Sequence, residues 1–136
     1  MRGKLPCMYE LAIIGGGPAG VAAGVYAARK RLKTVLIAET VGGQSTDSQD
    51  VQNWIGTPHI SGMDMAKNLE AHLREYAGDT LELKLGERAI SVEKGSEGFL
   101  IKTPQASYEA KTVFIATGGS RKKLEAVGAE QYENKG

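Results

Sequence analysis

The sequence has very little cysteine, almost no net charge and no long hydrophobic run. Its single cysteine, Cys7, cannot form a disulfide within the chain, which excludes a secreted, disulfide-rich scaffold. A net charge of +1 argues against nucleic acid or an anionic membrane as the main partner. No apolar run approaches the roughly 20 residues of a membrane-spanning helix, and no charged start leads into an apolar signal segment. We therefore expect a cytoplasmic protein that binds neither nucleic acid nor membranes.

Glycine and apolar residues are plentiful by contrast. Of the 136 residues, 18 are glycine and 41% are hydrophobic, so disorder is not expected and one core can be buried. The length suits a single domain or part of one. We expect an N-terminal extension over residues 1–8, one domain over residues 9–120, and a polar closing segment over residues 121–136.

The strongest pattern is a β-α-β unit within the first forty residues. Residues 11–14 (LAII) form a short apolar run that predicts a buried parallel strand. Pro18 suits the first turn of a helix, which continues over residues 21–29 with many small side chains that allow close packing on a sheet. Residues 35–38 (VLIA) predict a second buried strand.

The turn between the first strand and the helix has the spacing G-x-G-x-x-G, formed by Gly15, Gly17 and Gly20. The first glycine permits a tight turn, the second lets a pyrophosphate approach the backbone, and the third lets the helix pack against the strand. The N-terminus of the helix adds free N–H groups and a positive dipole end. Glu39 follows the second strand, where a carboxylate can accept hydrogen bonds from a ribose diol and would repel a 2′-phosphate. The pattern therefore predicts a dinucleotide site.

The rest of the domain is expected to contain a loop, a helix and short strands. Ser61, with Asp64 three residues later, resembles a capping box and predicts a helix over residues 62–76. Apolar alternation predicts strands over residues 81–85, 89–93, 99–102 and 107–111, and an apolar run predicts a buried strand over 113–116. We expect an α/β, Rossmann-like fold. In it a parallel sheet of about four strands is flanked by helices, and an inserted three-stranded antiparallel meander covers one face.

Three stretches of the sequence resemble a known family. They are IIGGGPAG, GGQSTDSQDVQNWIGTPHISG and TVFIATGGSRKKL. Together they are similar to the N-terminal, FAD-binding half of thioredoxin reductases and of the flavoprotein subunit of alkyl hydroperoxide reductases, which are class II pyridine nucleotide-disulfide oxidoreductases. The resemblance covers residues 9–136, and the final GAEQYENKG resembles the linker before the family's nicotinamide-binding domain. It implies a Rossmann-like FAD-binding fold that is incomplete at the C-terminus.

Carried over to the matching positions, the resemblance implies FAD as the cofactor. The positions that would lie against its pyrophosphate are Gly15, Gly17, Pro18 and Ala19, followed by Gly20. Glu39 would hold the adenosine ribose, and Ala89 would meet the adenine through its backbone. The flavin side would be lined by Gly43 and Gln44 and approached by Asn53. The last strand would bring Ala116, Thr117 and Gly118 close to the cofactor.

The chain departs from the family's pattern in three respects. Gln52 replaces the usual glutamate before Asn53, and Ile55 replaces the proline common after Trp54. The redox Cys-x-x-Cys, the nicotinamide-binding domain and the C-terminal Gly-Asp segment are absent from these 136 residues. The resemblance therefore implies NADPH or NADH, and a thioredoxin-like or other disulfide partner, only for an intact parent protein.

Our first interpretation is the FAD-binding part of an NAD(P)H-dependent, thioredoxin reductase-like oxidoreductase that lacks turnover on its own. A ferredoxin–NADP reductase-like flavoenzyme without a redox dithiol, and a free-standing nucleotide- or FAD-binding module, stay open as alternatives. An open sheet edge also predicts association with a second copy, as a homodimer. We assign no catalytic residue and no metal ligand, since His59 and His72 have no partners at metal-ligand spacing.

Overall fold

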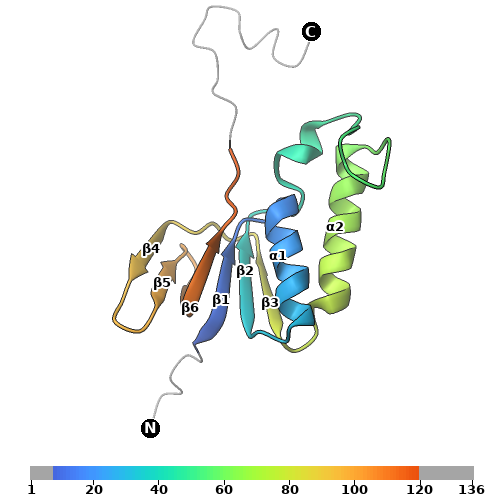
Figure 1. The fold of residues 1–136 in the computed structure, drawn as a ribbon. Helices are drawn as coiled ribbons and strands as arrows, with labels where there is room; N and C mark the ends of the chain where they lie inside the picture. The colour runs from blue at the N-terminus through green and yellow to red at the C-terminus, as the bar shows by residue number, and fades with distance from the viewer. Residues whose placement is uncertain (1–7, 120–136) are drawn as a thin grey trace, which may run out of the picture.

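The computed structural model describes residues 8–119, which form one six-stranded sheet and two α-helices (Figure 1). The strands are β1 (Tyr9–Ile14), β2 (Thr34–Ala38), β3 (Leu81–Leu85), β4 (Ser91–Lys94), β5 (Phe99–Lys102) and β6 (Ser107–Ile115). The helices are α1 (Pro18–Arg29) and α2 (Gly62–Ala77), with a short 3-10 helix η1 (Gly43–Asp47). The strand order is β3-β2-β1-β6-β5-β4, in which the first four strands are parallel and the meander of β4, β5 and β6 is antiparallel. The expected α/β fold with an inserted meander is confirmed.

Both α-helices pack against each other and on the same face of the parallel strands (Figure 1). The core on this side consists of Ile13, Val21, Val25, Ala28, Leu36, Ala38, Val41, Leu73 and Leu81. Gly24 is a poor helix former by propensity, but a Cβ at this position would lie 2.7 Å from Cδ1 of Leu73. Its missing side chain therefore lets α1 and α2 approach closely.

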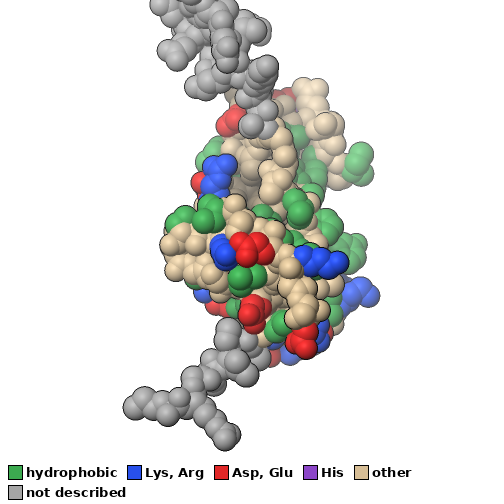
Figure 2. All heavy atoms as spheres, turned by 90° about the vertical axis from the view of Figure 1, so that its left-hand side faces the viewer, with side chains coloured by type: hydrophobic (Ala, Val, Ile, Leu, Met, Phe, Trp, Pro, Cys, Tyr) green, Lys and Arg blue, Asp and Glu red, His purple; other side chains and the backbone are tan. Residues whose placement is uncertain are grey.

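The meander covers the opposite face of the parallel strands. A second buried cluster joins Ala12, Ile14, Val35 and Ile37 of β1 and β2 to Ile101, Tyr108 and Ala110 of β5 and β6. None of its members belongs to a helix of residues 8–119. Figure 2 shows the meander side of the molecule, where acidic, basic and apolar side chains are interspersed. β2 and the second half of β1 are thus buried between helices and meander, as parallel strands generally are.

The prediction of two separate strands at the end of the domain is wrong. We expected two strands, over residues 107–111 and 113–116, and expected the second to be buried. Ser107–Ile115 is instead one continuous strand, whose first half pairs antiparallel with β5 and whose second half pairs parallel with β1. Phe114 and Ile115 are 43% and 66% exposed. The apolar run at the end of β6 is therefore not enclosed within the described part of the chain.

A change in the alternation of side chains along β6 explains why the sequence predicted two strands. Tyr108 and Val113 contact the same core cluster, although residues of a regular strand share a face only at even spacing. At the matching place in β1, the N–H groups of Glu10 and Leu11 both donate to the carbonyl of Lys33, at 2.8 and 3.3 Å, which is typical of a β-bulge. The two-residue period is lost where β6 changes its partner.

α2 begins as the sequence predicts. The Oγ of Ser61 accepts a hydrogen bond from the N–H of Asp64 at 3.0 Å and donates one to Oδ2 of Asp64 at 2.7 Å. Ser61→Ala should lower the free energy of unfolding by about 1 kcal/mol, because it leaves a helix N–H without its partner. Urea unfolding followed by circular dichroism measures the change, with Ser96→Ala in the β4–β5 turn as the control. Identical midpoints for Ser61→Ala and its control would show that the cap contributes nothing.

The boundaries agree with expectation only in part. β1 begins at Tyr9, at the start of the expected domain, and β4 begins two residues later than expected. The closing segment over residues 121–136, and all but the last residue of the expected extension, lie outside the described residues. In the described part of the chain, no helix has both the length and the apolar character needed to cross a membrane.

Candidate functional site

The turn between β1 and α1 depends on contacts that only glycine permits. Gly15 has a φ of +120°, and a Cβ at this position would overlap the carbonyl group of Ala116. A Cβ on Gly20 would overlap the carbonyl oxygen of Gly15. Gly15 and Gly20 therefore serve the packing of the turn, as the first and third glycines of the pattern are expected to do.

Gly17 is different, because a Cβ at this position would meet no protein atom within 4 Å beyond its chain neighbours. Gly17 is the N-cap of α1, and no side chain forms a capping hydrogen bond there. The first turn of α1 contains no acidic residue that would repel an anion. This end of α1 is therefore a place where an anionic group can approach the backbone.

Two further segments meet this turn at the carboxyl ends of the parallel strands. The N–H of Ala116, just after β6, donates to the carbonyl of Ile14 at 2.8 Å. The N–H of Gly42, in the loop after β2, donates to the carbonyl of Gly16 at 2.8 Å. The ends of β1, β2 and β6 are thus assembled around the N-terminus of α1, which is where open α/β sheets bind ligands.

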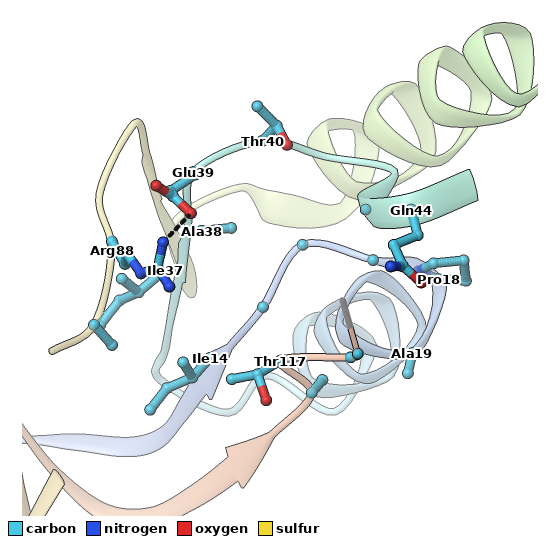
Figure 3. A pocket seen from close by; sticks show the side chains of 18 of the residues that line it. Ile14, Pro18, Ala19, Ile37, Ala38, Glu39, Thr40, Gln44, Arg88 and Thr117 are labelled. Carbon is cyan, nitrogen blue, oxygen red and sulfur yellow. Dashed lines mark ion pairs between the residues drawn. The ribbon is translucent and has the colours of Figure 1, made fainter. Parts of the chain in front are cut away.

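These segments surround an open cavity of about 540 Å³ (Figure 3). Most of the residues expected to bind a cofactor line it: Gly15, Gly17, Pro18, Ala19, Glu39, Gly43, Gln44, Ala89, Ala116, Thr117 and Gly118. In Figure 3 Glu39 lies at one end of the cavity, Gln44 and Pro18 lie at the other, and the β1–α1 turn runs between them. Residues far apart in the sequence therefore form one elongated site.

Two of the expected residues lie outside this cavity. Gly20 is buried in α1, behind the turn. Asn53 lines an adjoining hollow of about 340 Å³, which shares Gln44 and Ser45 with the main cavity. The structure thus brings Asn53 close to the Gln44 end without placing it in the main cavity.

The loop between η1 and α2 is more ordered than its composition indicates. Val51 and Ile60 pair as an antiparallel bridge. Nδ1 of His59 lies 3.0 Å from Oδ2 of Asp50, and hydrogen bonds, first from Gln52 and then from His59, hold the pKa of Asp50 below its usual value. Residues 8–119 contain no group of three or more His, Cys, Asp or Glu side chains placed to hold a metal ion. The His59–Asp50 pair ties the two arms of this loop together.

Reasoning from the sequence missed Arg88, which lies beside Glu39. Nη1 of Arg88 lies 3.6 Å from Oε2 of Glu39, and both side chains line the cavity (Figure 3). The side chains of Arg88 and Glu39 are 73% and 61% exposed, so solvent screens the ion pair and it contributes little to folding. Arg88 belongs to the connection between β3 and β4, where no periodicity indicates which side chain turns towards a site.

The segment that carries Arg88 is anchored by its neighbour Glu87. The N–H of Glu87 donates to the carbonyl of Ala38 at 3.3 Å. The carboxylate of Glu87 accepts hydrogen bonds from the hydroxyl of Thr103 at 2.8 Å and from that of Tyr108 at 2.8 and 2.9 Å. Burial, and then the hydrogen bond to Glu87, raise the pKa of Tyr108 to about 12, so its hydroxyl stays protonated as a donor. The meander thereby holds this segment against the end of β2.

A cavity at the carboxyl ends of parallel strands, next to a G-x-G-x-x-G turn and a helix N-terminus, is the arrangement of Rossmann-like dinucleotide-binding folds. Residues 9–136 match the family described as pyridine nucleotide-disulphide oxidoreductase. The chain belongs to this family of oxidoreductases, as the resemblance implied.

Individual relatives agree with this assignment. The chain is 41% identical over 130 residues to a subunit of the alkyl hydroperoxide reductase of Xanthomonas campestris pv. phaseoli, a match that covers 94% of this chain and 24% of the relative. The corresponding protein of Staphylococcus aureus is 40% identical over 129 residues. Thioredoxin reductases of Lactococcus lactis and Streptococcus pyogenes superpose with TM-scores of 0.82, at 30% and 36% identity, over 94% of this chain and 41% of each structure. The chain thus spans about a quarter of the length of these curated relatives.

Proposed function

We propose that this chain is the FAD-binding part of an NAD(P)H-dependent flavoprotein oxidoreductase of the thioredoxin reductase type. One observation carries the proposal, namely the order of groups along the cavity. The cavity runs from Glu39 at the end of β2, past the uncapped N-terminus of α1 and the open space beside Gly17, to Gln44. Ribose, pyrophosphate and flavin follow one another in the same order along FAD.

The residues present fit an adenine dinucleotide. Glu39 can accept hydrogen bonds from both hydroxyl groups of the adenosine ribose. The backbone N–H groups in the first turn of α1 can donate to a pyrophosphate, and the space beside Gly17 admits it. Gln44 and Asn53 lie at the end of the site that would face the flavin. When bound, FAD supplies the hydride chemistry, while the protein supplies binding and orientation.

For the longer parent protein we propose NADPH or NADH as the hydride donor and a thioredoxin-like or other disulfide protein as the acceptor. The names of the relatives, which are alkyl hydroperoxide reductase and thioredoxin reductase, support this part of the proposal. With Cys7 as its single cysteine, this chain cannot contain a redox dithiol. We further propose a cytoplasmic homodimer.

Equilibrium dialysis of the purified chain against FAD, ADP and FMN tests the proposal. FMN shares the flavin ring but lacks adenosine, whereas ADP has the adenosine and two phosphates without the flavin. Since Glu39 and the N-terminus of α1 would both contact the adenosine diphosphate part of FAD, we expect FAD and ADP to bind with similar affinity and FMN to bind at least about tenfold more weakly. Equal binding of FMN and FAD, or no binding of either adenosine ligand at millimolar concentration, would refute the proposal.

Reversing the charge at Glu39 should weaken FAD binding. Glu39→Arg removes the acceptor for the ribose diol and adds a second guanidinium beside Arg88, so we expect at least about tenfold lower affinity. Dialysis against FAD measures the change, and Glu93→Arg on β4, away from the cavity, is the control. If Glu39→Arg bound FAD as tightly as the parent chain, Glu39 would not contact the ribose.

A further inference from the structure

We propose that Arg88 is a specificity-determining residue at the Glu39 end of the cavity. Paired with Glu39, it leaves the site selective for a free ribose diol; released from Glu39, it accepts a 2′-phosphate. This inference rests on the proposed function, because it requires the adenosine to lie at Glu39. It concerns discrimination between dinucleotides that differ only at the ribose.

The guanidinium of Arg88 is paired but not saturated. Its Nη1 lies 3.6 Å from Oε2 of Glu39, which is longer than a direct hydrogen bond. The side chain is 73% exposed, so its N–H groups are accessible to a ligand. Glu87 is the other acidic residue lining the cavity, and its carboxylate is held by Thr103 and Tyr108. Glu39 is therefore the carboxylate that neutralises Arg88.

The backbone fixes the point from which Arg88 reaches the cavity. On one side of Arg88, the N–H of Gly86 donates to the carbonyl of Glu39 at 3.2 Å. On the other side, the N–H of Ile90 donates to the carbonyl of Lys102 at 2.8 Å. The segment is thus tied to the end of β2 and to β5, so Arg88 and Glu39 stay neighbours when a ligand enters.

The electrostatics of this pair decide which ribose is accepted. A carboxylate accepts hydrogen bonds from ribose hydroxyls and repels a phosphate, whereas an arginine at such a site pairs with a 2′-phosphate. With both groups present, a 2′-phosphate meets no net attraction. FAD and NADPH both carry adenosine, and only NADPH carries the 2′-phosphate. The pair would therefore keep NADPH out of a flavin site in a protein that handles both ligands.

The test compares ADP-ribose with 2′-phospho-ADP-ribose, which differ only in the 2′-phosphate. Isothermal titration calorimetry of the full chain at low salt gives the ratio of the two dissociation constants. We expect the parent to prefer ADP-ribose by about tenfold, and Glu39→Gln to shift the ratio about tenfold or more towards the phosphorylated ligand. The shift should disappear in Glu39→Gln/Arg88→Gln and persist in part in Glu39→Gln/Arg88→Lys, which keeps the charge.

The matched control is Glu70→Gln, which breaks the exposed Arg74–Glu70 ion pair (2.7 Å) on α2 and must leave the ratio unchanged. Thermal unfolding followed by circular dichroism shows that each variant is folded. An unchanged ratio in Glu39→Gln, or a shift that persists in Glu39→Gln/Arg88→Gln, overturns the role of Arg88. In that case a parent preference for ADP-ribose still supports the proposed function. Failure of the parent to bind either ligand overturns both proposals.

Discussion

Gly20→Ala is expected to lower the free energy of unfolding by about 3 kcal/mol or more, whereas Gly17→Ala is expected to change it by less than about 1 kcal/mol. A Cβ on Gly20 would overlap the carbonyl oxygen of Gly15, and Ala116 holds Gly15 from the other side. Relief of this overlap would separate α1 from β1 or β1 from β6. Beside Gly17 the space is open, and its φ of −71° suits alanine. Urea unfolding of the two variants and the parent measures the difference.

The same two variants separate folding from binding. Gly17→Ala should unfold like the parent but bind ADP at least about tenfold more weakly, since its Cβ would occupy the open space in which we propose that the pyrophosphate meets the backbone. Equilibrium dialysis against ADP measures the affinity. A parent-like urea midpoint for Gly20→Ala would contradict the packing role of the third glycine. Parent-like ADP binding by Gly17→Ala would show that no phosphate lies beside this residue.

Purified alone, the chain is expected to release FAD during gel filtration and to show no reductase turnover. Within residues 8–119, the proposed flavin end of the site is lined by Gln44, with Asn53 in the adjoining hollow. This chain covers 41% of each matching thioredoxin reductase structure, and we propose that the remaining part of such a protein contributes further contacts to the ring. Their loss should lower the affinity by several tenfold steps, each worth about 1.4 kcal/mol.

Self-association is expected from the same preparation because of the edge of β6. β5 pairs with β6 only as far as Ala110. On that side, no strand of the described residues pairs with residues 111–115. Phe114 and Ile115 are exposed in this stretch. A strand edge with apolar side chains tends to pair with another chain.

Gel filtration with light scattering and flavin absorbance measures both properties at once. Ile115→Lys, which places a charge on the exposed edge, should shift the chain towards the monomer, since natural edges are protected in this way. A monomeric parent chain that retains stoichiometric FAD would contradict the expectation and favour a free-standing flavin module. NADPH oxidation coupled to disulfide reduction by the purified chain would contradict the expected lack of turnover.

The parts of the fold that are determined by residues close together in the sequence could be predicted. The β1-α1-β2 unit has apolar runs and a glycine spacing, α2 has the Ser61 cap, and β5 has the predicted bounds Phe99–Lys102. The continuity of β6 could not be predicted in this way. It depends on two different partners, and one of them, β1, is distant in the sequence. A change in the alternation of side chains within one strand has the same appearance in a sequence as a strand end.

The site was predictable to a similar extent. The glycine spacing indicates a tight turn before a helix, and the position of Glu39 indicates the end of a parallel strand. Both patterns can be recognised without knowing the fold, and the structure brings these residues together as expected. Arg88 could not be found, because its direction depends on Glu87, which Thr103 and Tyr108 of the meander hold in place. The contacts of all these residues with a cofactor stay predictions.

The position of β6 also bears on how the chain folds as it is synthesised. β6 is the last strand of the described sequence but pairs in the middle of the sheet, with Tyr9 opposite Ala110. On the ribosome, β1 therefore emerges with an edge that stays open until about a hundred more residues have been made. Closing so long a loop is entropically unfavourable, so α1, α2 and the β4–β5 hairpin should form before β1 meets β6. Pulse-labelled hydrogen exchange during refolding should then protect the N–H of Ala116 later than the N–H groups of α2. Because Ala116 packs beside Gly15 at the edge of the cavity, a nascent chain cannot form the complete cavity until this strand has joined the sheet.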